Sequence, residues 1–186
     1  ELRLPGDKSV SHRALIMAGL AAGESRIAGA GDGADVRSTA GIVRALGATV
    51  ERIERDGRTV DYRVSSPGAD GLRAPAEPLD CGNSGTGTRL LTGLLAGQDF
   101  FTILTGDESI RRRPMGRVVK PLREMGAVIA GRKGGELAPL AITGTRLHGI
   151  DYTSPVASAQ IKSSLLFAGL FAEGTMRFRE PRLSRD

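Results

Sequence analysis

Three short polar segments hold the residue types best suited to binding a charged small molecule. They occupy residues 5–9, 82–86 and 157–160, and each places small and polar residues just ahead of an apolar stretch. Serine, threonine, asparagine and aspartate at a helix start accept hydrogen bonds from its free backbone N–H groups, and glycine allows a ligand to approach closely. Because a helix start also carries partial positive charge, each segment predicts a place where an anion could bind.

Basic side chains stand close to these segments. Lys8 and Arg13 lie on or beside the first, Arg89 follows the second, and an arginine run fills residues 111–113. A charge on a mostly apolar helix needs an anionic partner, which can be a protein carboxylate or a ligand. Ordinary capping explains any one segment, and the arginine run can be a solvated loop, but the threefold repetition favours a shared anion site.

Other candidates for chemistry are weaker. His12 is predicted to be a packing or hydrogen-bonding residue, and Cys81 a buried, inert thiol. Neither histidine nor Cys81 has the spacing of a metal site, so no metal is expected. The glycine-rich stretch 82–87 lacks the Gly-Lys-Ser/Thr of a P-loop and is not a dinucleotide fingerprint, so no cofactor is expected. Asp107 and Glu108 are expected to cap a turn.

An internal repeat organises the elements that must position these residues. Similar stretches occur at residues 11–23, 88–97 and 162–174, and their aligned glycines, Gly19, Gly93 and Gly169, are 74 and 76 residues apart. Each stretch is apolar or small nearly all round, which predicts a buried helix. Each ends in glycine, for which we expect a left-handed conformation at the helix end.

A second repeated piece, a helix running into a strand, is predicted at residues 36–50 and 115–129. Further strands are predicted at 25–28, 59–64, 100–104, 138–143 and 175–178. We therefore expect an α/β (α+β) fold of repeated βαβαββ units, with buried helices, outer sheets and pseudo-threefold symmetry. The expected units are residues 12–80, 81–150 and 151–186. Asp186 stands as far beyond Gly174 as Asp35 beyond Gly23, so the third unit is expected to be incomplete.

Composition narrows the class of protein. The 186 residues are 40% hydrophobic with a net charge of +5, and all but four of the 26 basic residues are arginine. Basic charge suggests nucleic acid, but aromatics are only 4% and tryptophan is absent, which argues against a stacking platform. No apolar run is long enough to cross a membrane. A single cysteine fits a reducing setting, so a cytoplasmic location is expected.

Five motifs resemble one known family. LPGDKSVSHR at residues 4–13 and GNSGTGTR at 82–89 are similar to the two signatures of the EPSP synthases (3-phosphoshikimate 1-carboxyvinyltransferases). RPMG at 113–116, SAQ at 158–160 and SRD at 184–186 match three further positions of that family in the same order. This order and spacing across nearly the whole chain make the resemblance specific.

The resemblance implies a fold of two similar domains, each of three units, which close on two anionic substrates. It implies transfer of the enolpyruvyl group of phosphoenolpyruvate to the 5-hydroxyl of shikimate 3-phosphate, with release of phosphate. The shikimate 3-phosphate ligands implied are Lys8, Ser9, Arg13, Ser158, Ala159, Gln160 and Arg185. The phosphoenolpyruvate ligands implied are Lys8, Asn83, Gly85, Arg113 and Gln160. Lys8 and Arg113 would stabilise charge during catalysis.

Two positions refine that assignment. Ala159 replaces a serine found in part of the family, so only its backbone N–H could serve there. Gly85 is the position whose enlargement reduces glyphosate binding in the family, so a sensitive form is implied.

The resemblance also implies that much of the enzyme lies outside this sequence. The C-terminal domain, with the acid–base carboxylates, is expected to be absent, so the chain alone is expected to be inactive. Residues 1–11 would form an inter-domain hinge strand, and the whole enzyme would be a monomer that uses no nucleic acid or membrane partner.

Two alternatives remain open at this stage. One is a non-catalytic module that grips phosphorylated ligands. The other is the UDP-N-acetylglucosamine enolpyruvyl transferase of the same superfamily, although that enzyme places asparagine after the N-terminal lysine, where this chain has Ser9.

Overall fold

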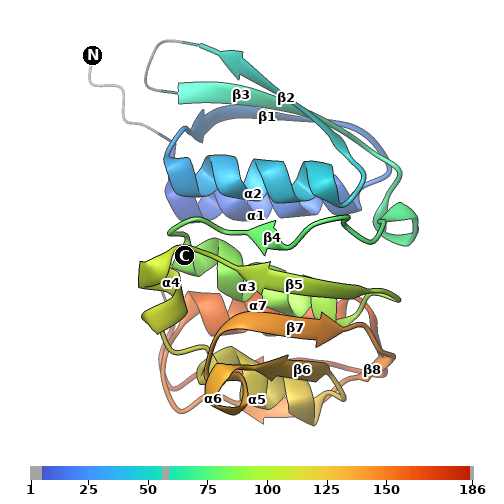
Figure 1. The fold of residues 1–186 in the computed structure, drawn as a ribbon, viewed down its shortest axis with the longest axis vertical. Coiled ribbons are helices and arrows are strands. Elements are labelled where there is room, and N and C mark those ends of the chain that lie inside the picture. Colours follow the sequence, from blue (N-terminus) through green and yellow to red (C-terminus); the bar gives the residue numbers. More distant parts are fainter. Residues whose placement is uncertain (1–5, 56–58, 185–186) are drawn as a thin grey trace.

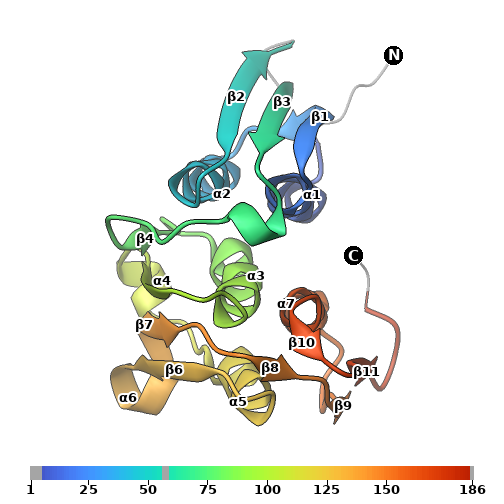
Figure 2. The same cartoon turned by 90° about the vertical axis from the view of Figure 1, so that its right-hand side faces the viewer.

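The structure is a computed structural model that describes residues 6–55 and 59–184. Its sheets lie on the outside, and five helices, α1, α2, α3, α5 and α7, run side by side between them. Figure 2 shows these helices roughly end-on. The mixed α/β class predicted from the sequence is confirmed, and the predicted burial of the repeated helices follows from their apolar and small side chains. No helix within the described ranges is long and apolar enough to cross a membrane.

The first part of the chain forms one sheet and two helices (Figure 1). The elements are α1 (Lys8–Leu20), β1 (Gly23–Gly31), α2 (Ala34–Ala45), β2 (Thr49–Glu54) and β3 (Thr59–Ser66). The strands are antiparallel in the order β1-β3-β2. Their inner face and the two helices enclose a core that includes Leu15, Val36, Val43, Tyr62 and Val64.

The second part repeats this arrangement with additions. After a 3-10 turn at Ala69–Gly71, the elements are β4 (Leu79–Asp80), α3 (Gly85–Ala96), β5 (Phe101–Thr105), α4 (Glu108–Arg112), α5 (Gly116–Glu124), β6 (Val128–Gly131), α6 (Arg132–Gly135) and β7 (Leu137–Thr143). The sheet order is β4-β5-β7-β6, so β5, β7 and β6 take the places of β1, β3 and β2. The extra strand β4 runs parallel to β5.

The end of the chain supplies a helix and four short strands. These are β8 (Leu147–His148), β9 (Asp151–Thr153), α7 (Ala159–Gly169), β10 (Ala172–Glu173) and β11 (Arg177–Arg179). β10 pairs with β8 and β11 pairs with β9, both in parallel. The structure thus places the third repeated helix, α7, against α3 and α5.

Helices α2 and α5 end in the same way. The backbone N–H of Gly47 donates to the carbonyl of Arg44, and that of Ala48 donates to Val43. Gly126 and Ala127 make the equivalent bonds at the end of α5. This pair of backbone hydrogen bonds requires a residue in the left-handed conformation just after the helix. Gly47 and Gly126 meet that requirement, with φ of 111° and 96°. The repeated Leu-Gly-Ala and Met-Gly-Ala sequences therefore encode the same helix stop.

The prediction that left-handed glycines end α1, α3 and α7 is wrong in detail. Gly97, which caps α3, has φ of −95°. A Cβ on Gly97 would lie 2.6 Å from the Cβ of Phe171, so a small residue is needed here for space. Gly23 and Gly174 do have positive φ, but they lie beyond the residues that cap α1 and α7.

The expected hinge strand at residues 1–11 also needs correction. Residues 8–11 are the first turn of α1, because the Asp7 side chain accepts from Val10 N–H at 2.7 Å and starts the helix. Residues 1–5 lie outside the described residues. The boundaries proposed for the three units stay predictions.

Candidate functional site

The three polar segments singled out in the sequence all cap helices. Asp7 caps α1, Ser84 caps α3 by accepting from Gly87 N–H at 2.9 Å, and Ser158 caps α7 by accepting from Ile161 N–H at 3.4 Å. Capping satisfies one N–H of each helix start and leaves the partial positive charge of the start in place. Whether these starts form one site depends on the contacts between them.

The starts of α1 and α3 are joined through α2. Lys8 Nζ lies 3.0 Å from Asp35 Oδ2, and His12 Nε2 lies 3.9 Å from the same oxygen. His12 Nε2 is also 3.3 Å from Ser84 Oγ, and its Nδ1 is 2.7 Å from Thr39 Oγ1. Lys8 is therefore linked to the cap of α3 by one acid and one histidine.

Burial and charge set the ionisation of this group. Burial lowers the pKa of His12 to about 4, although the Asp35 carboxylate opposes the shift, so the ring is neutral near pH 7. Burial acts to raise the pKa of Asp35, but the hydrogen bond and charge of Lys8 outweigh it and hold that pKa below its ordinary value. Asp35 is therefore ionised and fixes the Lys8 ammonium at the edge of α1.

The starts of α3 and α7 are joined by an arginine and a glutamine. Arg89 Nη1 donates to the carbonyl of Gly85 and to Gln160 Oε1, both at 3.0 Å. Arg89 Nη2 donates to the Pro114 carbonyl at 3.1 Å. Gln160 Nε2 donates to Thr86 Oγ1 at 3.0 Å. The first turns of α3 and α7 are thus held together by side chains.

Two guanidinium groups crowd Gly85. A Cβ on Gly85 would lie 2.8 Å from Arg113 Nη1 and 2.9 Å from Arg89 Nη1, so only glycine leaves both in place. Within the described residues Arg113 bonds Ser109 Oγ, and neither guanidinium contacts a carboxylate. Burial, followed by the charges of Arg113 and Arg117, lowers the pKa of Arg89. Two like charges at a helix start favour binding of an anion.

The structure therefore brings together four of the predicted site residues. Lys8, Gly85, Arg113 and Gln160 lie along one series of contacts that runs over the starts of α1, α3 and α7.

The other predicted residues lie around this series. Arg13, partly buried on α1, lines a hollow of about 210 Å³ with residues of α7. Ser158 and Ala159 line a hollow of about 500 Å³ at the start of α7. Ser9 is partly buried on α1, and Asn83 is exposed just before α3. Arg185 lies outside the described residues.

Sequence reasoning missed two members of the site. Asp35 entered the sequence analysis only as a spacing mark after Gly23, although an acid at the expected start of the helix that follows the first repeated stretch was a usable signal. Arg89 was noted only as added charge. Its three acceptors lie at residues 85, 114 and 160, and the sequence shows nothing that would bring those positions together.

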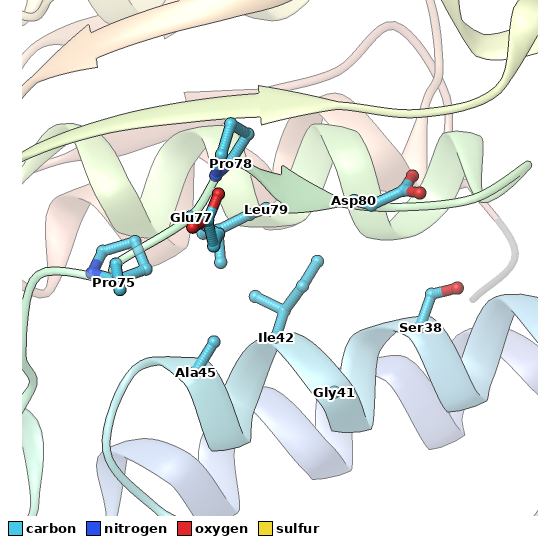
Figure 3. Close-up of a pocket in the computed structure, with 10 residues that line it drawn as sticks. Ser38, Gly41, Ile42, Ala45, Pro75, Glu77, Pro78, Leu79 and Asp80 are labelled. Carbon is cyan, nitrogen blue, oxygen red and sulfur yellow. The ribbon is translucent and has the colours of Figure 1, made fainter.

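A separate hollow of about 430 Å³ lies between α2 and β4. Figure 3 shows Ile42 of α2 and Leu79 of β4 approaching each other across it. Its lining is mainly apolar and includes none of the predicted site residues. It is therefore not a candidate for the anion site.

Cys81 is the inert thiol that the sequence predicted. Cys81 is buried, and burial raises the pKa of its thiol to about 12, so it is a poor nucleophile. In the described part of the chain, no cluster of histidine, cysteine, aspartate or glutamate side chains could hold a metal ion.

Comparison with known proteins identifies the family of the chain. The family model described as "EPSP synthase (3-phosphoshikimate 1-carboxyvinyltransferase)" matches residues 1–186. Among curated relatives, the 3-phosphoshikimate 1-carboxyvinyltransferase of Geobacter metallireducens is 54% identical over 186 residues, and that of a Synechococcus strain is 57% identical over 188. The chain is fully covered by both matches but spans only 42% and 41% of these relatives.

A solved structure of EPSP synthase from Acinetobacter baumannii superposes on the whole chain with a TM-score of 0.93 and 43% identity. The match covers 41% of that structure. Together with the family match over the full length, this shows that the chain belongs to the EPSP synthase (3-phosphoshikimate 1-carboxyvinyltransferase) family.

Proposed function

We propose that this chain supplies the shikimate 3-phosphate half-site of an enolpyruvyl transferase. The reaction moves the enolpyruvyl group of phosphoenolpyruvate to the 5-hydroxyl of shikimate 3-phosphate and gives 5-enolpyruvylshikimate 3-phosphate and phosphate. One observation carries the proposal. The starts of α1, α3 and α7 are joined by direct contacts, with Lys8, Arg89 and Arg113 presenting positive charge beside them.

The charges of the site suit this chemistry. The 5-hydroxyl gives its proton to a base as its oxygen adds to C2 of phosphoenolpyruvate, and C3 takes a proton from an acid. The resulting tetrahedral adduct then loses a proton from C3 to a base while phosphate leaves from C2. Both substrates and the adduct carry several negative charges. Lys8 and Arg113 can stabilise those charges without transferring a proton, and fixed donors in a closed site do this efficiently.

Each substrate has its own proposed ligands. Shikimate 3-phosphate would contact Lys8, Ser9 and Arg13 on α1 and Ser158, the Ala159 N–H and Gln160 at the start of α7. Arg185, which lies outside the described residues, completes the proposed set. Phosphoenolpyruvate would contact a set around the start of α3, which comprises Lys8, Asn83, Gly85, Arg113 and Gln160. Lys8 and Gln160 belong to both sets and would hold the two substrates together.

The proposal includes a partner. The acid–base groups and further phosphoenolpyruvate ligands would come from the C-terminal half of the enzyme. Closure of two domains would then exclude water and strengthen each polar contact.

Titration calorimetry with shikimate 3-phosphate tests the half-site. We expect heat of binding from the parent chain and little or none from Arg13→Ala, because the guanidinium that grips the phosphate is lost. Arg146→Ala is the matched control. It removes the same charge from a side chain that is 93% exposed and lies away from the site. The ion-pair partner of Arg146 is Glu173, with the Nη1 and Oε1 atoms 3.7 Å apart.

Three results would contradict parts of the proposal. Equal heats of binding for Arg13→Ala and the parent would show that Arg13 does not bind shikimate 3-phosphate. No heat of binding for the parent would show that the chain has no half-site for this ligand. A loss in Arg146→Ala as large as that in Arg13→Ala would indicate nonspecific attraction by net charge.

A further inference from the structure

The side-chain amide of Gln160 is held at both ends. Its Oε1 accepts from Arg89 Nη1, and its Nε2 donates to Thr86 Oγ1, each at 3.0 Å. We propose that Arg89 is a positioning residue that fixes the orientation of the Gln160 amide, so that Gln160 meets a bound anion only with an N–H group. This inference rests on the proposed function and gives a role to Arg89, which is not among the substrate ligands that the resemblance implies.

The direction of the amide follows from the donors available. A guanidinium has five N–H donors and no acceptor, so only the oxygen of the amide can face it. A hydroxyl such as that of Thr86 can accept from the amide nitrogen. A flipped amide would place NH2 against the guanidinium and lose the Arg89 bond. Arg89 therefore selects one of two orientations that would otherwise be similar in energy.

Arg89 is itself rigidly placed. The carbonyls of Gly85 and Pro114 each accept from its guanidinium, so it is anchored on α3 and on the segment before α5 as well as on α7. It is partly buried, and within the described residues its hydrogen bonds go to these carbonyls and to the Gln160 oxygen. A fixed charge of this kind orients a neighbouring dipole at little entropic cost.

The orientation of the Gln160 amide decides which of its polar groups a bound ligand would meet. One N–H of the Gln160 amide bonds to Thr86, and the second is left for a ligand oxygen. Together with Arg113 beside Gly85, the site then offers hydrogen-bond donors to phosphate or carboxylate oxygens. The reversed amide would present a carbonyl oxygen, which repels such ligands.

The variant Gln160→Glu tests the proposed orientation, because it should weaken binding of shikimate 3-phosphate without lowering thermal stability. The glutamate keeps the shape and can pair with Arg89, so we expect an unchanged or higher melting temperature. It replaces the N–H donor by an anionic oxygen, so shikimate 3-phosphate should bind at least about tenfold more weakly. Unchanged affinity in Gln160→Glu would overturn the inference.

A double-mutant cycle tests whether Arg89 acts through Gln160. Arg89→Met should weaken binding of shikimate 3-phosphate in the parent but have a much smaller effect in a Gln160→Ala background. Equal losses in both backgrounds would show that Arg89 acts on the ligand directly. Arg89→Lys, which keeps the charge but loses the planar fork, should recover only part of the affinity.

A ligand-free measurement separates this inference from the proposed function. In nuclear magnetic resonance spectra, the side-chain NH2 of Gln160 should exchange slowly with solvent in the parent and faster in Arg89→Met. Equal exchange in the two proteins overturns the positioning role, whether or not shikimate 3-phosphate binds. If the parent shows slow exchange but no binding, the proposed function fails and the positioning role stands.

Discussion

His12 is the most completely enclosed polar side chain of the site, with none of its surface exposed. Both ring nitrogens have polar neighbours, Thr39 on one side and Ser84 and Asp35 on the other. A proton on both nitrogens would require a cation in a buried space, which is why burial lowers its pKa. The ring thus serves as a neutral spacer that sets the distance between α1, α2 and α3.

That neutrality predicts how stability depends on pH. In the unfolded chain His12 would titrate near 6.5, whereas in the fold its pKa is about 4. Between these values the unfolded state binds more protons, so the free energy of unfolding should fall as pH decreases from 6.5 to 4 and then level off for this group. The total effect is on the order of 3 kcal/mol.

Urea unfolding at several pH values measures this slope. The carboxylates whose pKa values are lowered, such as Asp61, affect stability only below about pH 5, so the slope above that pH is assigned to His12. His12→Gln should flatten the curve between about pH 5 and 6.5. A flat curve for the parent would show that folding does not lower the pKa of His12.

At the scale of elements, the closest helix contact is between α3 and α7. A Cβ on Gly93 would lie 1.9 Å from the Ser164 backbone carbonyl oxygen, so the two backbones approach as closely as glycine allows. This approach brings the first turns of the two helices within reach of Arg89 and Gln160. The repeated glycine found in the sequence is therefore a packing residue.

Gly93→Ala should destabilise the fold by more than about 3 kcal/mol, because the obstacle is backbone and cannot rotate away. Gly41→Ala is the matched control. Gly41 also lies inside a helix, but nothing lies within 4 Å of an added Cβ, so the substitution should stabilise by roughly 0.5–1 kcal/mol. Denaturant unfolding of both variants checks the prediction, and equal effects would contradict it.

The elements were largely predictable because their signals are local. Apolar and small residues identified α1, α3 and α7, and the predicted strands at 59–64, 100–104 and 138–143 correspond to β3, β5 and β7. The helix α4 was missed, since the arginine run at residues 111–113, which contains its last two residues, was interpreted as a possible solvated loop. One capping acid, Asp107, which accepts from Ile110 N–H at 2.9 Å, and one buried apolar residue, Ile110, form this single turn.

The site was less predictable than the elements, and the reason is distance along the chain. Lys8, Gly85, Arg113 and Gln160 were all named from motifs, but their contacts run through Asp35, His12 and Arg89. The bond between His12 and Ser84 joins positions 72 apart, and that between Arg89 and Gln160 joins positions 71 apart. No local pattern encodes such pairs. They follow from how the helices pack.

For the whole molecule, the proposed chemistry needs a proton donor and acceptor near the reacting atoms. In the described residues the carboxylates beside Lys8 are Asp7, whose side chain caps α1, and Asp35, which Lys8 holds ionised. We therefore expect no turnover from the 186-residue chain in a coupled phosphate-release assay. The full-length Geobacter metallireducens relative, assayed under the same conditions, is the control. A comparable rate for the two proteins would contradict the proposal.

The series of contacts from Lys8 to Gln160 has a consequence for folding. It crosses from the β1–β3 layer to the β4–β7 layer and on to α7, so it exists only when every layer has docked. A small molecule that binds along this series of contacts would act as a reversible cross-link between segments more than a hundred residues apart in the chain. Its occupancy would then raise the thermal midpoint of the entire chain, and calorimetric melting with added shikimate 3-phosphate would report whether the layers unfold as one cooperative unit.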